Sequence, residues 1–173
     1  TEGERLIRSG EWSGWTPTQL MGRRVHRRNL GIIGMGRIGQ ALALRALGFG
    51  MTINYHNRKR LEVGIENNLN AKYWKNLDQM IGNTDVLSIN APLTADTAKI
   101  LNADRLGKMC PNSILINTAR GGLIDEKALI RMLKDGSIAA AGLDVFDREP
   151  LINPKLLKLE NVVLLPHLGS STK

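Results

Sequence analysis

The alternation of short apolar runs with amphipathic segments, from Asn29 onward, restricts the fold of this chain more than any other feature. Most of the apolar runs have too little polar alternation for one face to contact water, which is typical of strands in a parallel sheet covered by helices. The order βαβαβ predicts an α/β fold, a doubly wound parallel sheet of the Rossmann type in a three-layer αβα arrangement. The expected strands are 30–33, 52–55, 86–90, 114–117, 140–145 and 162–165, and the expected helices are 39–47, 77–81 and 126–134.

The first twenty residues differ from the rest of the chain. Residues 1–20 read as a short polar helix followed by an irregular arm that contains Trp12, Trp15 and Pro17. Exposed tryptophan is unfavourable, so this segment is a candidate dimerisation element. Residues 21–173 are expected to form one dinucleotide-binding domain.

Composition excludes several classes of protein. At 173 residues the chain is long enough for one core, and no apolar run approaches the 18 residues of a membrane span. A net charge of +8 raises nucleic acid as a partner, but aromatic residues make up only 4% and no zinc-finger or RNA-binding signature accompanies the basic clusters. We therefore expect no nucleic-acid and no membrane partner. The single Cys110, expected to be at least partly buried, and the lack of a signal peptide favour the cytoplasm.

A glycine-rich turn follows the first expected strand. Gly34, Arg37 and Ile38 belong to the run Gly34-Met35-Gly36-Arg37-Ile38-Gly39, which fits G-x-G-x-x-G. Gly34 permits a tight turn, Gly36 allows a diphosphate to approach the backbone, and Gly39 allows close packing of helix and strand. Because a strand precedes the motif and a helix follows it, the turn predicts a pyrophosphate site at a helix N-terminus.

The end of the second expected strand bears on the choice of cofactor. Asn57 and Arg58 stand where an NAD enzyme usually places an acid that binds the adenosine 2′-hydroxyl. Asn57 can hydrogen-bond a ribose, and Arg58 can pair with a 2′-phosphate, so NADP(H) is favoured over NAD(H). The alternative is that residues 58–60 only begin a solvated surface segment.

Three further motifs lie at or near expected strand ends, where open α/β sheets bind ligands. They are Asn117-Thr118-Ala119-Arg120-Gly121-Gly122-Leu123-Ile124-Asp125, Gly142-Leu143-Asp144-Val145-Phe146-Asp147-Arg148-Glu149-Pro150 and Leu165-Pro166-His167-Leu168-Gly169-Ser170-Ser171-Thr172. The guanidinium of Arg120 could bind a carboxylate through two hydrogen bonds.

With the glycine turn and Asn90-Ala91-Pro92-Leu93-Thr94, these motifs resemble the NAD(P)-binding domain of the D-isomer-specific 2-hydroxyacid dehydrogenase family, especially its glyoxylate and hydroxypyruvate reductases. The resemblance runs from about Trp12 to the last residue. It implies that Arg120 binds substrate, that His167 donates and accepts the proton, and that Glu149 is its acidic partner. It also implies that Asp144 faces the nicotinamide carboxamide, and that further cofactor contacts come from Ala91, Pro92, Thr97, Thr118, Ala119 and Gly169.

The chemistry of such a reaction calls for the same residue types. Hydride delivery to a 2-keto carbon leaves an alkoxide that needs a proton, which His167 can supply. A carboxylate such as Glu149 favours the protonated ring and orients it. Arg120 can stabilise the substrate carboxylate and the developing oxyanion.

Other expectations follow from the resemblance and from residue spacing. The family's separate substrate domain is expected to be missing from this chain, and its arm implies a homodimer. His26 and His56 lack Cys or acidic neighbours at metal spacing, so we expect no metal site. The alternative to an enzyme is a nucleotide-sensing or interaction module of the same fold, similar to transcriptional co-repressors that resemble this family. The Arg120, Glu149 and His167 set favours the enzyme.

Overall fold

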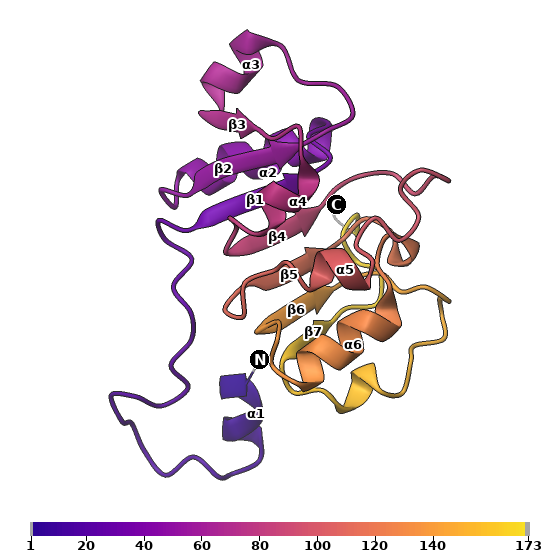
Figure 1. The fold of residues 1–173 in the computed structure, drawn as a ribbon. Coiled ribbons are helices and arrows are strands. Elements are labelled where there is room, and N and C mark those ends of the chain that lie inside the picture. Colours follow the sequence, from indigo (N-terminus) through magenta and orange to yellow (C-terminus); the bar gives the residue numbers. More distant parts are fainter. Residues whose placement is uncertain (1, 172–173) are drawn as a thin grey trace.

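The computed structural model describes residues 2–171 and consists of one parallel sheet with helices on both faces (Figure 1). The strands run in the spatial order β3-β2-β1-β4-β5-β6-β7, and every pair is parallel. This order reverses direction between β1 and β4, which confirms the doubly wound prediction. The strands are β1 (Asn29–Ile33), β2 (Thr52–His56), β3 (Ala71–Tyr73), β4 (Val86–Ile89), β5 (Ile114–Asn117), β6 (Ala140–Leu143) and β7 (Val162–Leu164).

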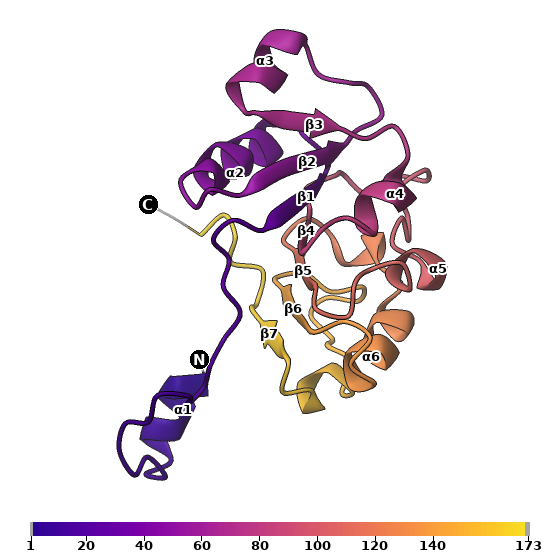
Figure 2. The same cartoon turned by 60° about the vertical axis from the view of Figure 1, so that its left-hand side comes forward.

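Helices cover the two faces of the sheet unequally. In Figure 2, α2 lies on one face, and α4, α5 and α6 lie on the other. Each face has its own apolar cluster. Ala43 of α2 and Ile53 of β2 belong to one, and Leu106 of α5 and Leu129 of α6 belong to the other. The helices are α1 (Glu2–Arg8), α2 (Arg37–Leu47), α3 (Val63–Asn68), α4 (Leu77–Ile81), α5 (Ala103–Leu106) and α6 (Glu126–Lys134), with 3₁₀ turns η1 (Gly121–Leu123) and η2 (Leu156–Lys158).

The sequence predicted most of the elements and missed three of them. All six expected strands and three expected helices are present, although the strands expected over 86–90 and 140–145 end at Ile89 and Leu143. The elements α3, β3 and α5 were not expected. In α3 the two apolar side chains, Val63 and Ile65, lie two residues apart and show no helical spacing, and the three residues of β3 and four of α5 are too few for a hydrophobic period to be recognised.

The segment before β1 stands apart from the sheet. The helix α1 has no buried residue, and residues 9–28 form neither helix nor strand and extend away from the sheet in both views (Figures 1 and 2). Trp12 and Trp15 are 52% and 79% exposed. No helix in the described range 2–171 is long and apolar enough to cross a membrane.

Candidate active site

The glycine turn joins β1 to α2 at the reversal point of the sheet. Gly34 has φ +94°, and its N–H donates to the carbonyl of His56 at 3.0 Å. A Cβ at Gly34 would lie 2.6 Å from the Ala91 nitrogen, and one at Gly39 would lie 2.4 Å from the Gly34 oxygen. Glycine at these two positions is therefore required by the turn and by the packing around it.

Gly36 is different from the other two glycines of the turn. Its φ of −78° is open to any residue, and a Cβ there would meet no atom within 4 Å. Neither the backbone nor the packing of the protein explains this glycine, whereas a ligand close to the backbone would. Gly36 is also the N-cap of α2, and no side chain caps the helix, so the first-turn N–H groups and the helix dipole are available to an anion.

The loop after β2 presents an unpaired arginine. His56 is held through Nδ1, 2.9 Å from the Trp74 carbonyl oxygen, and the Asn57 carbonyl accepts a hydrogen bond from the Tyr73 hydroxyl. Arg58 is exposed, and within the described residues no ion pair involves it. Arg60 is instead paired with Glu66.

The loop after β4 is closed by one hydroxyl group. Thr97 Oγ1 donates to the Pro92 carbonyl at 2.6 Å and accepts from the Thr94 N–H at 2.8 Å. Ala91 is buried and packs against Gly34. The predicted residues Ala91, Pro92 and Thr97 thus share the sheet edge of the glycine turn, with the Thr97 side chain holding the loop in shape.

The loop after β5 is shaped by a residue that the sequence did not single out. The buried Asn117 side chain donates to the Arg120 carbonyl at 2.9 Å and accepts from the Ala119 N–H at 3.0 Å. Thr118 and the Arg120 side chain are exposed beyond it. Asn117 could have been noticed as a polar residue closing an apolar strand, because such a side chain commonly bonds a backbone two residues on.

The same loop packs closely on the segment that carries Glu149. A Cβ at Gly121 would lie only 1.9 Å from the carbonyl carbon of Phe146, so glycine is needed where the two backbones approach each other. This contact brings the Arg120 loop against the loop after β6.

His167 and Glu149 form a hydrogen-bonded pair. Nδ1 of His167 lies 2.8 Å from Oε2 of Glu149, and the other carboxylate oxygen accepts from the Phe146 N–H at 2.9 Å. An ionised carboxylate only accepts hydrogen bonds, so Nδ1 carries the proton and Nε2 takes no part in this bond. The pKa of Glu149 is held below its usual value, first by the bond from His167, then by the Phe146 N–H, with a smaller contribution from the positive charge of Arg120. Of the three predicted catalytic residues, the structure therefore joins His167 and Glu149 directly, whereas the Arg120 guanidinium donates to the neighbouring Ala119 carbonyl at 2.6 Å.

Asp144 anchors the histidine loop. It is 3% exposed, and its two oxygens accept from the N–H groups of Leu168 and Gly169, both at 2.7 Å. A Cβ at Gly169 would lie 3.0 Å from the Asp144 carboxylate, so the loop approaches closely. The preceding His167 has φ +56°, a conformation that non-glycine residues rarely adopt and that the flanking bonds maintain. The expected contact between Asp144 and the nicotinamide stays a prediction.

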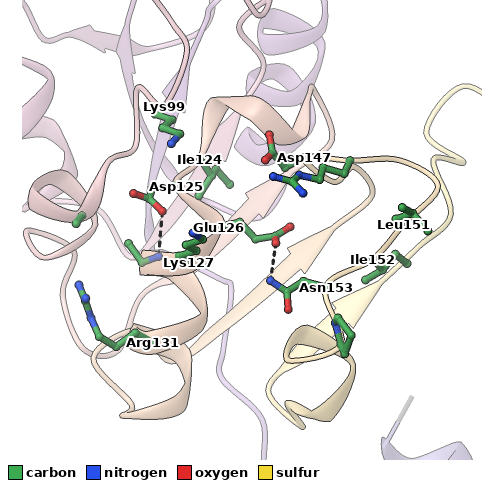
Figure 3. Close-up of a pocket in the computed structure, with 14 residues that line it drawn as sticks. Lys99, Ile124, Asp125, Glu126, Lys127, Arg131, Asp147, Leu151, Ile152 and Asn153 are labelled. Atoms are coloured by element: carbon green, nitrogen blue, oxygen red, sulfur yellow. Dashed lines mark hydrogen bonds between the residues drawn. The ribbon is translucent and has the colours of Figure 1, made fainter.

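Two cavities lie beside this edge. One of about 870 Å³ is lined by His56, Trp74 and Asp96, next to the loop that carries Arg58. Another of about 710 Å³ lies beside the start of α6, where Glu126 accepts a hydrogen bond from Asn153 (Figure 3). Neither cavity is lined by any of the predicted site residues.

Two further expectations concern cysteine and metal. Cys110 is exposed, so the expectation that it is at least partly buried is wrong; it lies in the turn before β5 with its sulfur 3.5 Å from the Gly82 carbonyl. Within residues 2–171, no three His, Cys, Asp or Glu side chains gather as a metal site would require.

Comparison with known proteins places these features in one family. The family model described as "D-isomer specific 2-hydroxyacid dehydrogenase, NAD binding domain" matches residues 1–169. A glyoxylate reductase of Pyrococcus horikoshii is 47% identical over 99% of this chain and 52% of its own length. The chain thus spans about half the length of the curated relatives it matches.

Solved structures agree. The structure of a putative D-isomer specific 2-hydroxyacid dehydrogenase from Polaromonas sp. JS6 66 matches 99% of this chain and 53% of its own chain, with a TM-score of 0.94 and 47% identity. That of an NADPH-dependent glyoxylate/hydroxypyruvate reductase from Sinorhizobium meliloti, solved with citrate, matches 99% of this chain and 52% of its own, with a TM-score of 0.87 and 40% identity.

Proposed function

This chain belongs to the D-isomer specific 2-hydroxyacid dehydrogenase family, and from that premise we propose that it is the cofactor-binding part of a glyoxylate or hydroxypyruvate reductase. The reaction interconverts a 2-keto acid and a D-2-hydroxy acid. The pairing of His167 with Glu149 at 2.8 Å, on the sheet edge that carries the glycine turn, is the observation that most supports it. A module that only sensed the nucleotide would not need this pair.

The chain offers a fitting site for the dinucleotide. The open space over Gly36 and the uncapped start of α2 suit a pyrophosphate, while Asn57 and Arg58 lie at the adenosine end. Asp144 and Gly169 are proposed to border the nicotinamide end. When bound, the nicotinamide ring supplies or accepts the hydride at carbon 2 of the acid.

His167 is the proposed proton donor in reduction. Its Nδ1 is engaged by Glu149, so Nε2 delivers the proton to the oxygen that becomes the hydroxyl. Glu149 stays ionised at neutral pH because its pKa is lowered, so its carboxylate accepts the hydrogen bond from Nδ1 and orients the ring. The Phe146 N–H fixes the carboxylate, so the imidazole has one orientation.

Arg120 is proposed to bind the substrate carboxylate. Its side chain is exposed at the end of β5, and its positive charge contributes to the lowered pKa of Glu149, which supports a role beside the proposed proton donor. A guanidinium can grip a carboxylate through two hydrogen bonds and can also stabilise charge that develops on the keto oxygen.

We propose NADP(H) as the preferred cofactor. No acidic residue follows β2 within the run Asn57–Arg60, and Arg58 is free to pair with a 2′-phosphate. The related enzyme of Sinorhizobium meliloti is described as NADPH-dependent. The carboxylate of Glu66, which could repel a phosphate, is turned into the protein and paired with Arg60.

A homodimer in the cytoplasm, without nucleic-acid partners, completes the proposal. The exposed Trp12 and Trp15 of the segment 1–20 are the suggested contact between subunits.

The test is to purify the full gene product and to follow absorbance at the nicotinamide band with glyoxylate and hydroxypyruvate, using NADPH and NADH in parallel. Turnover of either acid is expected, and it should be lost in His167→Ala. If NADPH binds but no 2-keto acid is reduced, the enzyme is the wrong proposal and a sensing module is supported instead.

A further inference from the structure

The loop between β2 and α3 is pinned on both sides of Arg58. Before it, the Tyr73 hydroxyl donates to the Asn57 carbonyl at 3.3 Å. After it, the Tyr55 hydroxyl accepts from the Leu61 N–H at 3.0 Å. The exposed Arg58 is therefore displayed on a loop whose two ends are tied to the sheet.

A buried carboxylate completes the attachment of this loop. Glu66 in α3 is 5% exposed, yet it is not part of the proposed catalytic set. It accepts from Arg60 Nε at 2.9 and 3.1 Å and from Arg60 Nη2 at 2.7 Å, and the Tyr55 hydroxyl also donates to it. The Arg60 guanidinium lies 5.8 Å from the ring centre of Tyr73.

The ionisation of this cluster is stable at neutral pH. Arg60, followed by the Tyr55 hydroxyl, holds the pKa of Glu66 below its usual value. Burial, followed by the bond to Glu66, raises the pKa of Tyr55 to about 12, so its hydroxyl remains a donor. The cluster is thus an arginine and a carboxylate fixed against a neutral phenol.

We propose that Glu66, Arg60 and the Tyr55 hydroxyl form a brace that positions Arg58 for the adenosine 2′-phosphate. Glu66 is then a specificity-determining positioning residue that does not touch the cofactor. This inference rests on the proposed preference for NADP(H). It also gives the two arginines of the basic run 58–60 different roles: Arg58 contacts the phosphate, and Arg60 holds the loop.

The brace contributes through preorganisation. A loop that is already ordered loses little conformational freedom when the phosphate binds, whereas an untied loop must be ordered on binding. The brace also keeps the Glu66 carboxylate neutralised and turned away from an incoming phosphate. Cofactor without the 2′-phosphate gains from neither effect, so the brace should affect NADPH and leave NADH unchanged.

The deciding variant is Glu66→Gln, because two explanations predict opposite signs. If only net charge mattered, removing a negative charge near the phosphate site would tighten NADPH binding. If Glu66 holds Arg60 and the loop, Glu66→Gln should weaken NADPH binding by about three- to tenfold, the range expected for one or two newly mobile side chains. Tyr55→Phe changes no charge and should weaken NADPH binding in the same direction.

The experiment is calorimetric titration of the chain with NADPH and with NADH. Glu62→Gln is the matched control, because it removes the same charge four residues earlier from an exposed side chain that makes no capping bond. Hydrogen exchange of the Leu61 amide gives a readout without cofactor and should be faster in Tyr55→Phe. Thermal melts identify any variant that fails to fold, and Tyr73→Phe then replaces it.

The outcomes separate this inference from the proposed cofactor preference. Arg58→Ala should weaken NADPH binding about ten- to a hundredfold, as expected for a lost hydrogen bond to a charged group. If Arg58→Ala does so while Glu66→Gln binds NADPH as well as the Glu62→Gln control, or better, the brace is refuted and the preference stands. If Arg58→Ala leaves NADPH binding unchanged, the preference itself fails, and the brace fails with it.

Discussion

Alanine substitutions at two glycines of the same turn should separate cofactor binding from folding. A Cβ at Gly36 would meet nothing within 4 Å, and the residue has ordinary dihedral angles. Replacing it by alanine reduces the conformational freedom of the unfolded chain, which should stabilise the folded state by about 0.4–1 kcal/mol. Alanine is also a poorer N-cap than glycine, which should destabilise the folded state by a similar amount. The free energy of unfolding of Gly36→Ala should therefore stay within about 1 kcal/mol of the wild type.

The affinity for the cofactor, unlike the stability, should fall strongly in Gly36→Ala. The methyl group of Gly36→Ala would occupy the open space over the α2 N-terminus and keep a pyrophosphate from the backbone N–H groups. Losing one hydrogen bond to a charged group costs about 1.5–3 kcal/mol, which corresponds to roughly ten- to a hundredfold in the dissociation constant.

Gly39→Ala is the matched comparison. Its Cβ would lie 2.4 Å from the Gly34 oxygen and 3.2 Å from Ile32 Cγ2, inside the protein. Overpacking of this kind costs about 1–3 kcal/mol or more, so the melting temperature should fall by about 2–12 °C. Calorimetric titration with NADPH and thermal unfolding measure the two effects. Wild-type affinity in Gly36→Ala, with the fold intact, would refute the assignment of this turn to the pyrophosphate.

The remaining predictions concern catalysis, pH and assembly. In the full gene product, His167→Ala should lower kcat by about 10²–10⁴-fold, and steady-state rates that stay near normal would exclude it as the proton donor. Arg120→Ala should raise KM and lower kcat/KM for the 2-keto acid, and an effect on kcat alone would argue against carboxylate binding. Glu149→Ala removes the acceptor that orients the His167 ring, so it should lower kcat and leave the affinity for NADPH unchanged, and a wild-type kcat would contradict that role. The pKa of Glu149 is lowered from 4.5 in the folded protein, so its ionised form stabilises the fold above pH 4.5, and this contribution is lost as the pH falls through the folded pKa. Acid denaturation curves should therefore show that the difference in free energy of unfolding between the wild type and Glu149→Gln disappears over this pH range. Sedimentation should detect a dimer that Trp12→Ala and Trp15→Ala weaken, because aromatic side chains commonly anchor an interface. A wild-type protein that is monomeric at roughly tens of micromolar would contradict the arm contact.

Much of the fold followed from local patterns. Apolar runs such as Leu30–Ile33 identified strands buried on both faces, and three glycines marked the turn into α2. The strand β3 escaped notice because its three residues lie at the sheet edge and are only partly buried at most. Cys110 was misjudged because cysteine is usually buried, whereas the turn that carries it faces solvent.

The sequence by itself determined the order of the elements and the residue types at their ends, because periodicity and turn chemistry act over a few neighbouring residues. It could place Arg120, Glu149 and His167 near strand ends, but not the atoms through which Glu149 and His167 meet. Only the tertiary structure decided that His167 uses Nδ1 toward Glu149, that Asp144 holds the histidine loop and that Arg60 is committed to Glu66. These contacts join residues of different loops and helices, and their partners depend on which strands become neighbours and how closely their loops approach.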